Sequence, residues 1–231
     1  NLTGLKITEL REQTGDKIRD VINQVNTIAV KIADLNNQLT PIASLGSDAG
    51  GTIINERARL VEELSKLVGP VSTSLDGNGL MEVKVGGSSL VATVVPLKIQ
   101  MKETISSTSE RTISFELTSQ AGNVLTTLQP TSGELASLTK HYNVTLDGED
   151  SSGGTSLMKR LNELAEAFVV KVNAIAGSGY GMDDVQQLHR NFFDPSSTTA
   201  MTIRLSNDIK DKPRDLPMSA FPGTPGDNTI A

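Results

Sequence analysis

The strongest constraint on the fold is a run of apolar residues in the first part of the chain, spaced alternately by three and four positions. The run consists of Ile18, Val21, Val25, Ile28, Ile32, Leu35 and Leu39. Such a heptad pattern predicts a long helix with one apolar seam. We expect the helix to end near Leu39, because the residue before Pro41 disfavours the α conformation. Packing inside a bundle is the plainer interpretation of the seam, and an intermolecular coiled coil is the alternative.

Three further helices are predicted. The second covers 53–67 and ends at Gly69-Pro70, and its charged residues Arg57, Arg59, Glu62 and Glu63 are interpreted as solvated. A short helix covers 132–140, and a Gly/Ser/Asp linker at 147–154 precedes a long helix over 156–176. The predicted seam of this last helix is Leu157, Leu161, Leu164, Phe168, Val172 and Ile175. Thr155 or Ser156 is expected to cap it, and Gly177 to end it.

Between the second and third helices the apolar period changes to two, which indicates strands. Strands are expected at 71–75, 81–85, 89–95, 98–102, 112–117 and 123–128. The first two flank Asp76-Gly77-Asn78-Gly79, whose residues accept positive φ and favour a hairpin turn. We expect one antiparallel sheet with one solvated face. The rest of the chain, 178–231, is expected to be loop-rich with a short strand at 201–205.

These elements predict an α+β fold, in which an elongated helical bundle with long coiled-coil-like helices carries an inserted antiparallel β domain. The expected division is 1–69 for the first part of the bundle, 70–130 for the β insertion, 131–178 for the second part, and 179–231 for the loop-rich region. Aromatic residues make up only 3% of the chain, so Leu, Ile, Val and Ala must build the core. Such aliphatic seams suit helix packing and thin sheets.

Composition excludes several classes of function. The net charge of −6 disfavours nucleic acid and anionic membrane surfaces as partners, because both need clustered Lys and Arg. With no Cys, the chain has no disulfide, thiolate nucleophile or Cys-based metal site. No apolar run approaches the roughly 18 residues of a membrane span. The start of the chain shows no signal peptide pattern, and we expect the chain to be a fragment or a processed piece.

No catalytic, cofactor-binding or metal-binding residue is predicted, and we expect the protein not to be an enzyme. His141 and His189 lack the spacing of a zinc site, and no Gly-x-Ser-x-Gly elbow is present. Asp183-Asp184 and the acidic stretch 147–150 could suggest calcium, but neither has the ligand spacing of a calcium loop, so solvated acidic loops are expected. The Gly-rich stretch 177–181 follows a helix, and it predicts a helix stop more than a phosphate cradle.

Short motifs follow one another in order along nearly the whole chain. The first helix carries Asn26, Ala33, Leu35 and Asn36, the second carries Arg57, Leu60, Val61, Leu64 and Ser65, and the strand region carries Leu90 and Val91. Later motif residues are Gly133, Leu135, Asn173, Phe192, Phe193, Gly226, Asp227 and Asn228. This series resembles the first hook-associated protein of the bacterial flagellum, the FlgK type. Asn55, Glu56 and Ala58 depart from the family's pattern.

The resemblance implies a structural subunit at the flagellar hook–filament junction, which adapts the hook lattice to the filament lattice and transmits torque. It implies a core fragment without the family's terminal helices, and no cofactor. Implied partners are other copies in a junction ring, the hook protein, the second junction protein and an export chaperone. Implied localisation is extracellular, after export by the flagellar secretion apparatus. The alternatives are another axial protein, such as the second junction protein or a flagellin, and a secreted carbohydrate-active or adhesin module.

Overall fold

The structure is a computed structural model that describes residues 2–43, 50–105, 111–146, 156–224 and 227. Helices and two antiparallel sheets make up the fold, which confirms the predicted α+β class. The chain divides into two compact units. The sheet unit comprises residues 10–154, and the loop unit comprises residues 1–9 and 155–231. The sequence-based division into four consecutive ranges stays a prediction.

Two helices supply much of the core of the sheet unit: α1 (Leu2–Ala43) and α2 (Gly51–Val68). Six of the seven seam residues of α1 are buried, and Leu35 is half-buried. α1 runs four residues past Leu39, so the predicted end of this helix is wrong. Proline lacks an N–H and therefore removes one hydrogen bond from a helix, but Pro41 does so only in the last turn.

The first sheet contains β1 (Val71–Leu75), β2 (Met81–Val85), β3 (Ser88–Ala92) and β4 (Val95–Pro96), with antiparallel neighbours in that order. The turn between β1 and β2 is held by Asp76, whose carboxylate accepts the N–H groups of Asn78 and Leu80. Gly79 has a φ of 76°, which a glycine adopts without steric cost. The predicted hairpin is therefore present.

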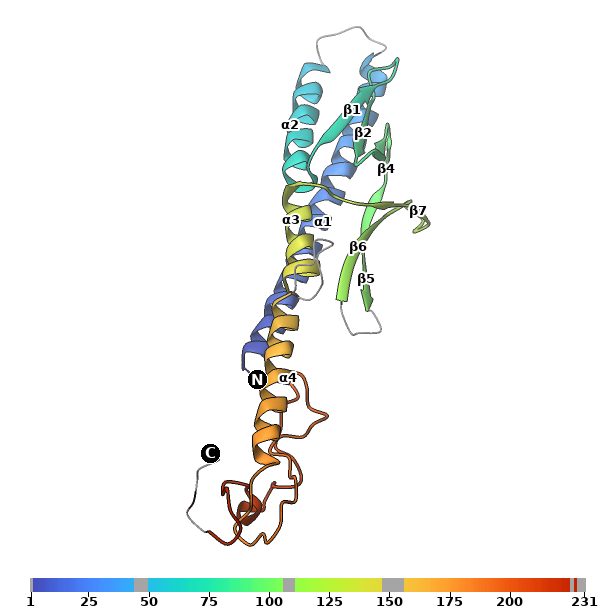
Figure 1. Ribbon diagram of the computed structural model, residues 1–231. Helices are drawn as coiled ribbons and strands as arrows, with labels where there is room; N and C mark the ends of the chain where they lie inside the picture. Colours follow the sequence, from blue (N-terminus) through green and yellow to red (C-terminus); the bar gives the residue numbers. More distant parts are fainter. Residues whose placement is uncertain (1, 44–49, 106–110, 147–155, 225–226, 228–231) are drawn as a thin grey trace. The chain divides into compact units, whose positions relative to one another are not determined.

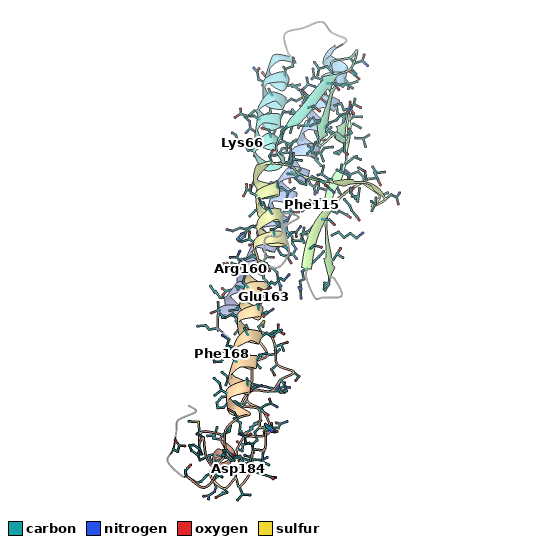
Figure 2. The ribbon with its side chains drawn as sticks, viewed as in Figure 1. Lys66, Phe115, Arg160, Glu163, Phe168 and Asp184 are labelled. Atoms are coloured by element: carbon teal, nitrogen blue, oxygen red, sulfur yellow. The ribbon has the colours of Figure 1, made fainter. Side chains whose placement is uncertain are left out.

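The second sheet contains β5 (Lys98–Ile105), β6 (Arg111–Thr118) and β7 (Val124–Leu128), again antiparallel in chain order. The prediction of a single sheet is wrong. Pro96 ends β4 because it has no N–H to donate, and the next residue, Leu97, donates back to the carbonyl of Leu90 at 2.8 Å. Figure 1 shows the strands of both sheets beside α1. Phe115 of β6, labelled in Figure 2, is among the largest buried side chains of the shared core.

The two ends of the β region meet at a pair of glycines. Gly69 follows α2 and Gly133 begins α3 (Gly133–Lys140), with φ values of 85° and 84°. A Cβ on Gly69 would overlap the side chain of Ser132, and a Cβ on Gly133 would overlap the backbone of Gly69. Only residues without a side chain allow this close crossing of the chain. We call this crossing the glycine neck.

A π-helix, η2 (His141–Leu146), extends α3 and contributes Tyr142 and Leu146 to the buried residues. The linker predicted at 147–154 lies outside the described residues. α4 (Leu157–Ala176) belongs to the loop unit, and Gly177 follows its last residue. The hydroxyl of Ser156 accepts the N–H of Lys159 at 3.2 Å, which confirms Ser156 as the N-cap.

The buried face of α4 differs from the predicted seam. Ala165, Val169 and Ala176 are the buried residues. Leu164 and Phe168 are 67% and 52% exposed. Among the other predicted seam residues, Leu157 and Ile175 are exposed, whereas Leu161 and Val172 are half-buried. Asn162 and Asn173 of α4 bond to backbone groups of the loop that follows the helix. Apolar periodicity alone does not tell which face of a helix such a loop will cover.

After α4, the loop unit has little regular structure within its described residues. It contains a 3-10 turn, η3 (Pro213–Asp215), and isolated bridges that join Tyr180 to Ser219 and Phe193 to Leu205. The strand predicted at 201–205 is wrong, because only Leu205 makes a bridge. Ile7 and Gly4 of α1 belong to this unit, and the side chain of Met201 packs against Gly4.

Candidate functional site built by asparagine contacts

Four asparagines on helices hold strands and loops in place by the same geometry. In each contact, the side-chain oxygen accepts the N–H of one residue and the side-chain nitrogen donates to the C=O of that residue. The pairs are Asn26 with Ile99, Asn36 with Met81, Asn143 with Ile113 and Asn173 with Phe193. An amide side chain carries both groups, so it can take the place of a neighbouring strand. All eight hydrogen bonds measure between 2.7 and 3.1 Å.

The Asn26 contact joins α1 to an edge of the second sheet. Ile99 lies on β5, whose only neighbour in that sheet is β6. The backbone of an edge strand has one side without a strand partner, and Asn26 pairs with that backbone at one residue. Ile99 itself is 1% exposed, so an unpaired N–H or C=O there would be costly.

The Asn143 contact completes the central strand of the same sheet. β7 pairs with Phe115 to Thr118 of β6, so the first half of β6 has no β7 neighbour. Asn143, on η2, occupies this position opposite Ile113. The preceding residue, Tyr142, donates its hydroxyl to a carboxylate oxygen of Glu103 at 2.9 Å. Burial, together with this hydrogen bond to Glu103, raises the pKa of Tyr142 to about 12.

The Asn36 contact contains a buried charge. Nη1 of Arg57 donates to the side-chain oxygen of Asn36 at 2.7 Å and to the carbonyl of Gly79 at 3.0 Å. Asn36 in turn bonds to the backbone of Met81 and donates to the carbonyl of Thr93. Arg57 is 2% exposed and Asn36 is fully buried. Both helices and two loops of the first sheet therefore meet at one polar cluster.

Sequence analysis predicted a solvated Arg57, and this prediction is wrong. Glu56 and Glu63 bind the neighbouring Arg59 at the surface, whereas Arg57 points into the core. Burial lowers the pKa of the Arg57 guanidinium. In the part of the chain that the structure describes, no carboxylate is paired with Arg57, and its buried Nε has no hydrogen-bond partner. Charge spacing along α2 does not reveal this burial.

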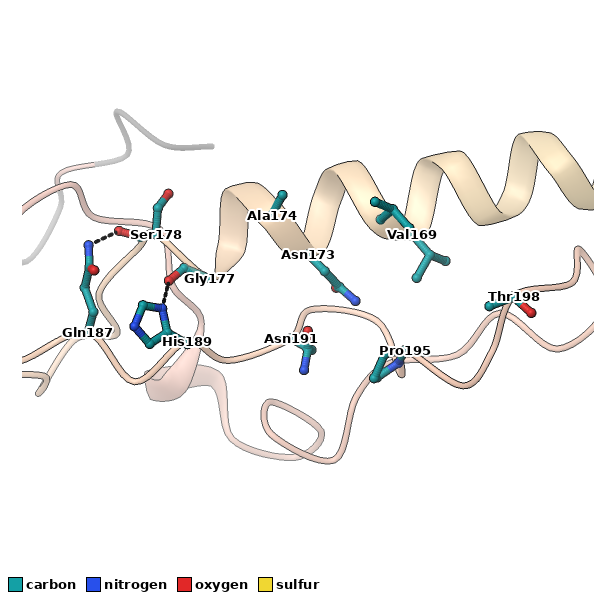
Figure 3. Close-up of a pocket in the computed structure, with 11 residues that line it drawn as sticks. Val169, Asn173, Ala174, Gly177, Ser178, Gln187, His189, Asn191, Pro195 and Thr198 are labelled. Carbon is teal, nitrogen blue, oxygen red and sulfur yellow. Dashed lines mark hydrogen bonds between the residues drawn. The ribbon is translucent and has the colours of Figure 1, made fainter.

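The Asn173 contact lies in the loop unit. Asn173 of α4 holds Phe193, whose ring lies 4.9 Å from that of Phe192 and 5.5 Å from that of Phe168. Beside it runs a groove of about 620 Å³, shown in Figure 3, between α4 and the loop 187–198. Val169 and Asn173 face this loop, while Gln187 and His189 bond to backbone carbonyls after the helix. The lining residues include no carboxylate, so the groove lacks the acid pair of a glycosidase.

Asp183 and Asp184, two of the acidic residues singled out in the sequence, form ion pairs. Asp184 is buried and its carboxylate pairs with Arg190, which lowers the pKa of Asp184. The carboxylate of Asp183 forms an exposed bidentate ion pair with the guanidinium of Arg214. The expectation of a solvated acidic loop therefore fails for Asp184, which Figure 2 labels in the loop unit. The stretch 147–150 lies outside the described residues.

The described residues form neither a metal site nor a membrane span. Within residues 2–43, 50–105, 111–146, 156–224 and 227, no group of three or more His, Asp or Glu could hold a metal ion. None of the described helices is both long and apolar enough to cross a membrane. Nδ1 of His189 lies 2.9 Å from the carbonyl oxygen of Gly177, which accepts its hydrogen bond.

The structure brings several motif residues together. Asn26, Asn36, Arg57 and Asn173 make the contacts described above, and Gly133 lies in the glycine neck. Ala33, Leu60, Leu64, Leu90, Val91 and Leu135 are buried, whereas Leu35, Val61, Phe192 and Phe193 are half-buried. The hydroxyl of Ser65 donates to the carbonyl of Glu62, and the carboxylate of Asp227 accepts the N–H of Ala220. Gly226 and Asn228 lie outside the described residues.

Sequence reasoning missed Asn143, Tyr142 and Thr93. Asn143 lies in a π-helix, and the side chain–backbone contact spans 30 positions of sequence. The only signal in the sequence was that Asn143 is polar and lies between Tyr142 and Val144, and this does not identify its partner.

Comparison with known proteins identifies the family of this chain. A family model described as the flagellar hook-associated protein FlgK helical domain matches residues 1–193 of this chain. The chain belongs to this family. The match confirms the resemblance seen in the motifs, and it covers all four asparagine contacts.

Individual FlgK relatives agree with the family match. The chain is 25% identical over 174 residues to flagellar hook-associated protein 1 from Salmonella typhimurium and to that from Salmonella typhi. Each alignment covers 74% of this chain and 30% of the relative. The solved flagellar hook junction protein FlgK from Burkholderia pseudomallei matches with a TM-score of 0.58 and 25% identity, over 78% of this chain and 31% of that one. The chain thus spans about a third of the relatives that it matches.

Proposed function

We propose that this chain is part of a structural, non-catalytic subunit at the flagellar hook–filament junction, which adapts the hook lattice to the filament lattice and transmits torque. Membership of the FlgK family supports this role, as does the likeness to a solved protein that is described as a flagellar hook junction protein. This role is a role of the whole protein. The relatives are about three times as long as the part that matches this chain.

The asparagine contacts are the structural observation that best fits a mechanical role. A subunit that transmits torque must keep its strands and helices from sliding past one another under load. Apolar packing resists separation but has little directionality, whereas a pair of hydrogen bonds to one residue fixes its position along a helix. In the sheet unit, Asn26, Asn36 and Asn143 each fix one strand in this way.

The proposed partners follow from this role. They are other copies of the protein in a junction ring, the hook protein on one side and the second junction protein on the other. We also propose export of the unassembled subunit by the flagellar secretion apparatus with the help of a chaperone, and an extracellular place in the flagellum. The role requires no cofactor, nucleic acid or membrane.

Localisation of the full-length protein tests the proposal. A small epitope tag on the full-length protein, detected by immunogold electron microscopy on isolated flagella, should label one narrow band between hook and filament. An untagged strain gives the background, and a tagged hook protein marks the hook. Label along the whole filament would indicate a flagellin-like protein. Label displaced toward the filament from the end of the hook would indicate the second junction protein.

A further inference from the structure

One of the three asparagine contacts in the sheet unit differs from the other two. Asn26 and Asn143 bond only to neutral backbone groups, whereas Asn36 also accepts a hydrogen bond from the guanidinium of Arg57. Arg57 is 2% exposed, and within the part of the chain that the structure describes its guanidinium donates to two neutral oxygens and to no carboxylate. Its Nε is buried without a partner. Arg57 is therefore a buried charge that its surroundings compensate only in part.

Such an arrangement is a poor way to gain stability. Removal of a guanidinium from water is unfavourable. Hydrogen bonds to two neutral acceptors offset only part of this penalty, because the buried Nε–H has no acceptor. The lowered pKa of Arg57 agrees with incomplete compensation. In other proteins, replacement of buried charges by apolar side chains of similar volume is often neutral or stabilising. The presence of Arg57 in this core therefore needs a reason other than stability.

The acceptors of Arg57 indicate what that reason is. Arg57 lies on α2, and its two acceptors belong to α1, at Asn36, and to the turn between β1 and β2, at Gly79. Asn36 also bonds to the N–H of Met81, the first residue of β2. A slip of α2 by one turn along α1 would move the guanidinium by about 5.4 Å and leave it buried without acceptors. Only one relative position of the three segments satisfies the charge.

We propose that Arg57 and Asn36 form a register latch, which selects one docked position of the turn 76–79 on α1 and α2 and does so at a cost in stability. Apolar seams with repeating Leu, Ile and Val tolerate shifts by a turn, because each shifted position still buries similar side chains. A buried charge with fixed acceptors does not tolerate such shifts. The inference goes beyond the proposed function, since it concerns how the subunit keeps its shape and holds wherever the subunit is located.

The test uses full-length protein and two measurements, thermal melting and site-resolved hydrogen exchange. Arg57→Met keeps a similar length without the charge. We expect its melting temperature to equal or exceed that of the wild type, while the amides of Leu80 and Met81 exchange roughly tenfold faster or more, which corresponds to about 1.4 kcal/mol. Asn143→Ala is the matched control from a neutral contact. It should lower the melting temperature and leave exchange in the turn 76–79 at the wild-type rate.

A second substitution keeps the test decisive. Asn36→Ala leaves the charge without its main acceptor, so it should lower the melting temperature strongly in the wild-type background and much less in the Arg57→Met background. A lower melting temperature for Arg57→Met alone would overturn the inference, because Arg57 would then be an ordinary stabilising contact. Unchanged exchange at Leu80 and Met81 would also overturn it, because the turn would then be held without the charge.

Discussion

The two units of this chain are stabilised in different ways. In the sheet unit, one continuous core contains apolar residues from α1, α2, both sheets, α3 and η2. Among the described residues of the loop unit, the buried aliphatic residues are few: Ile7, Ala165, Val169, Ala176 and Ile209. The loop unit nevertheless has most of the large exposed apolar side chains, including Leu164, Phe168, Val185 and Phe221. Polar contacts such as Asp184 with Arg190 and Asp194 with Arg204 connect its loops.

This difference shows that the same apolar spacing on a helix can lead to a buried face in one unit and an exposed face in another. α1 and α4 both carry apolar residues at heptad spacing, but the seam of α1 is buried and the corresponding face of α4 is largely exposed. Hydrophobic burial should therefore dominate the stability of the sheet unit. Hydrogen bonds and ion pairs should contribute a larger share in the loop unit, which makes that unit more sensitive to pH.

The largest expected effect separates a helical leucine of the sheet unit from a helical leucine of the loop unit. Leu64 of α2 is 0% exposed and Leu164 of α4 is 67% exposed. Leu64→Ala should lower the free energy of unfolding of the sheet unit by about 3 kcal/mol, because it leaves a cavity. Leu164→Ala should change the free energy of unfolding of the loop unit by no more than about 0.5 kcal/mol. Native-state hydrogen exchange on full-length protein measures both, and equal losses would refute the contrast.

An intermediate effect is expected for the asparagine contacts. Asn143→Ala leaves the N–H and C=O of Ile113 unpaired inside the sheet unit, so we expect a loss of about 2 kcal/mol. Asn173→Ala makes the same change at Phe193, which is only half-buried, so water can replace the bonds and the loss should stay below about 1 kcal/mol. Hydrogen exchange measured at increasing denaturant concentration gives the free energy of unfolding of each unit in the two variants. A larger loss for Asn173→Ala would show that polar contacts are stronger in the loop unit.

The smallest effect concerns acid. Hydrogen bonds from the hydroxyl and N–H of Ser196, followed by Arg204, lower the pKa of Asp194 from 3.8 to about 2. A carboxyl group with a lowered pKa stabilises the folded state above its unfolded pKa, and this contribution is lost as pH falls through the folded value. Amide protection around Ser196 should therefore weaken between about pH 4 and pH 2. Asp194→Asn should remove that pH dependence, and the sheet unit serves as the internal control.

Much of the architecture could be predicted from the sequence, because the spacing of apolar residues and the residue types of turns and caps are local signals. The heptads of α1, the hairpin around Asp76 and the cap at Ser156 are examples. The failures have a common physical cause. Apolar spacing shows which residues share a face of α4, but whether that face is covered depends on distant loops. The burial of Arg57 likewise depends on Asn36 and Gly79, which are 21 and 22 positions away.

The candidate site was predicted only in part. The resemblance to the family identified Asn26, Asn36, Arg57 and Asn173 as motif residues. No sequence pattern indicated that the asparagines bond to backbone groups. The sequence did not identify the partner of Asn143, because its contact depends on the shorter length of β7 relative to β6. Long-range pairing of this kind is a property of the folded sheet.

The glycine neck has a consequence for how such proteins can diversify. Because Gly69 and Gly133 touch, the chain leaves the helices and returns to them at nearly the same point. The chain between these two glycines is therefore joined covalently to the helices at one place, and its described strands contact the helices otherwise only through side chains, as in the asparagine contacts and the shared core. Strands within this segment can be lengthened, lost or replaced by another domain without a change in the distance that the flanking helices must span. In such a lineage, variation would accumulate inside this segment, while the two glycines and the helix surfaces next to them would change slowly.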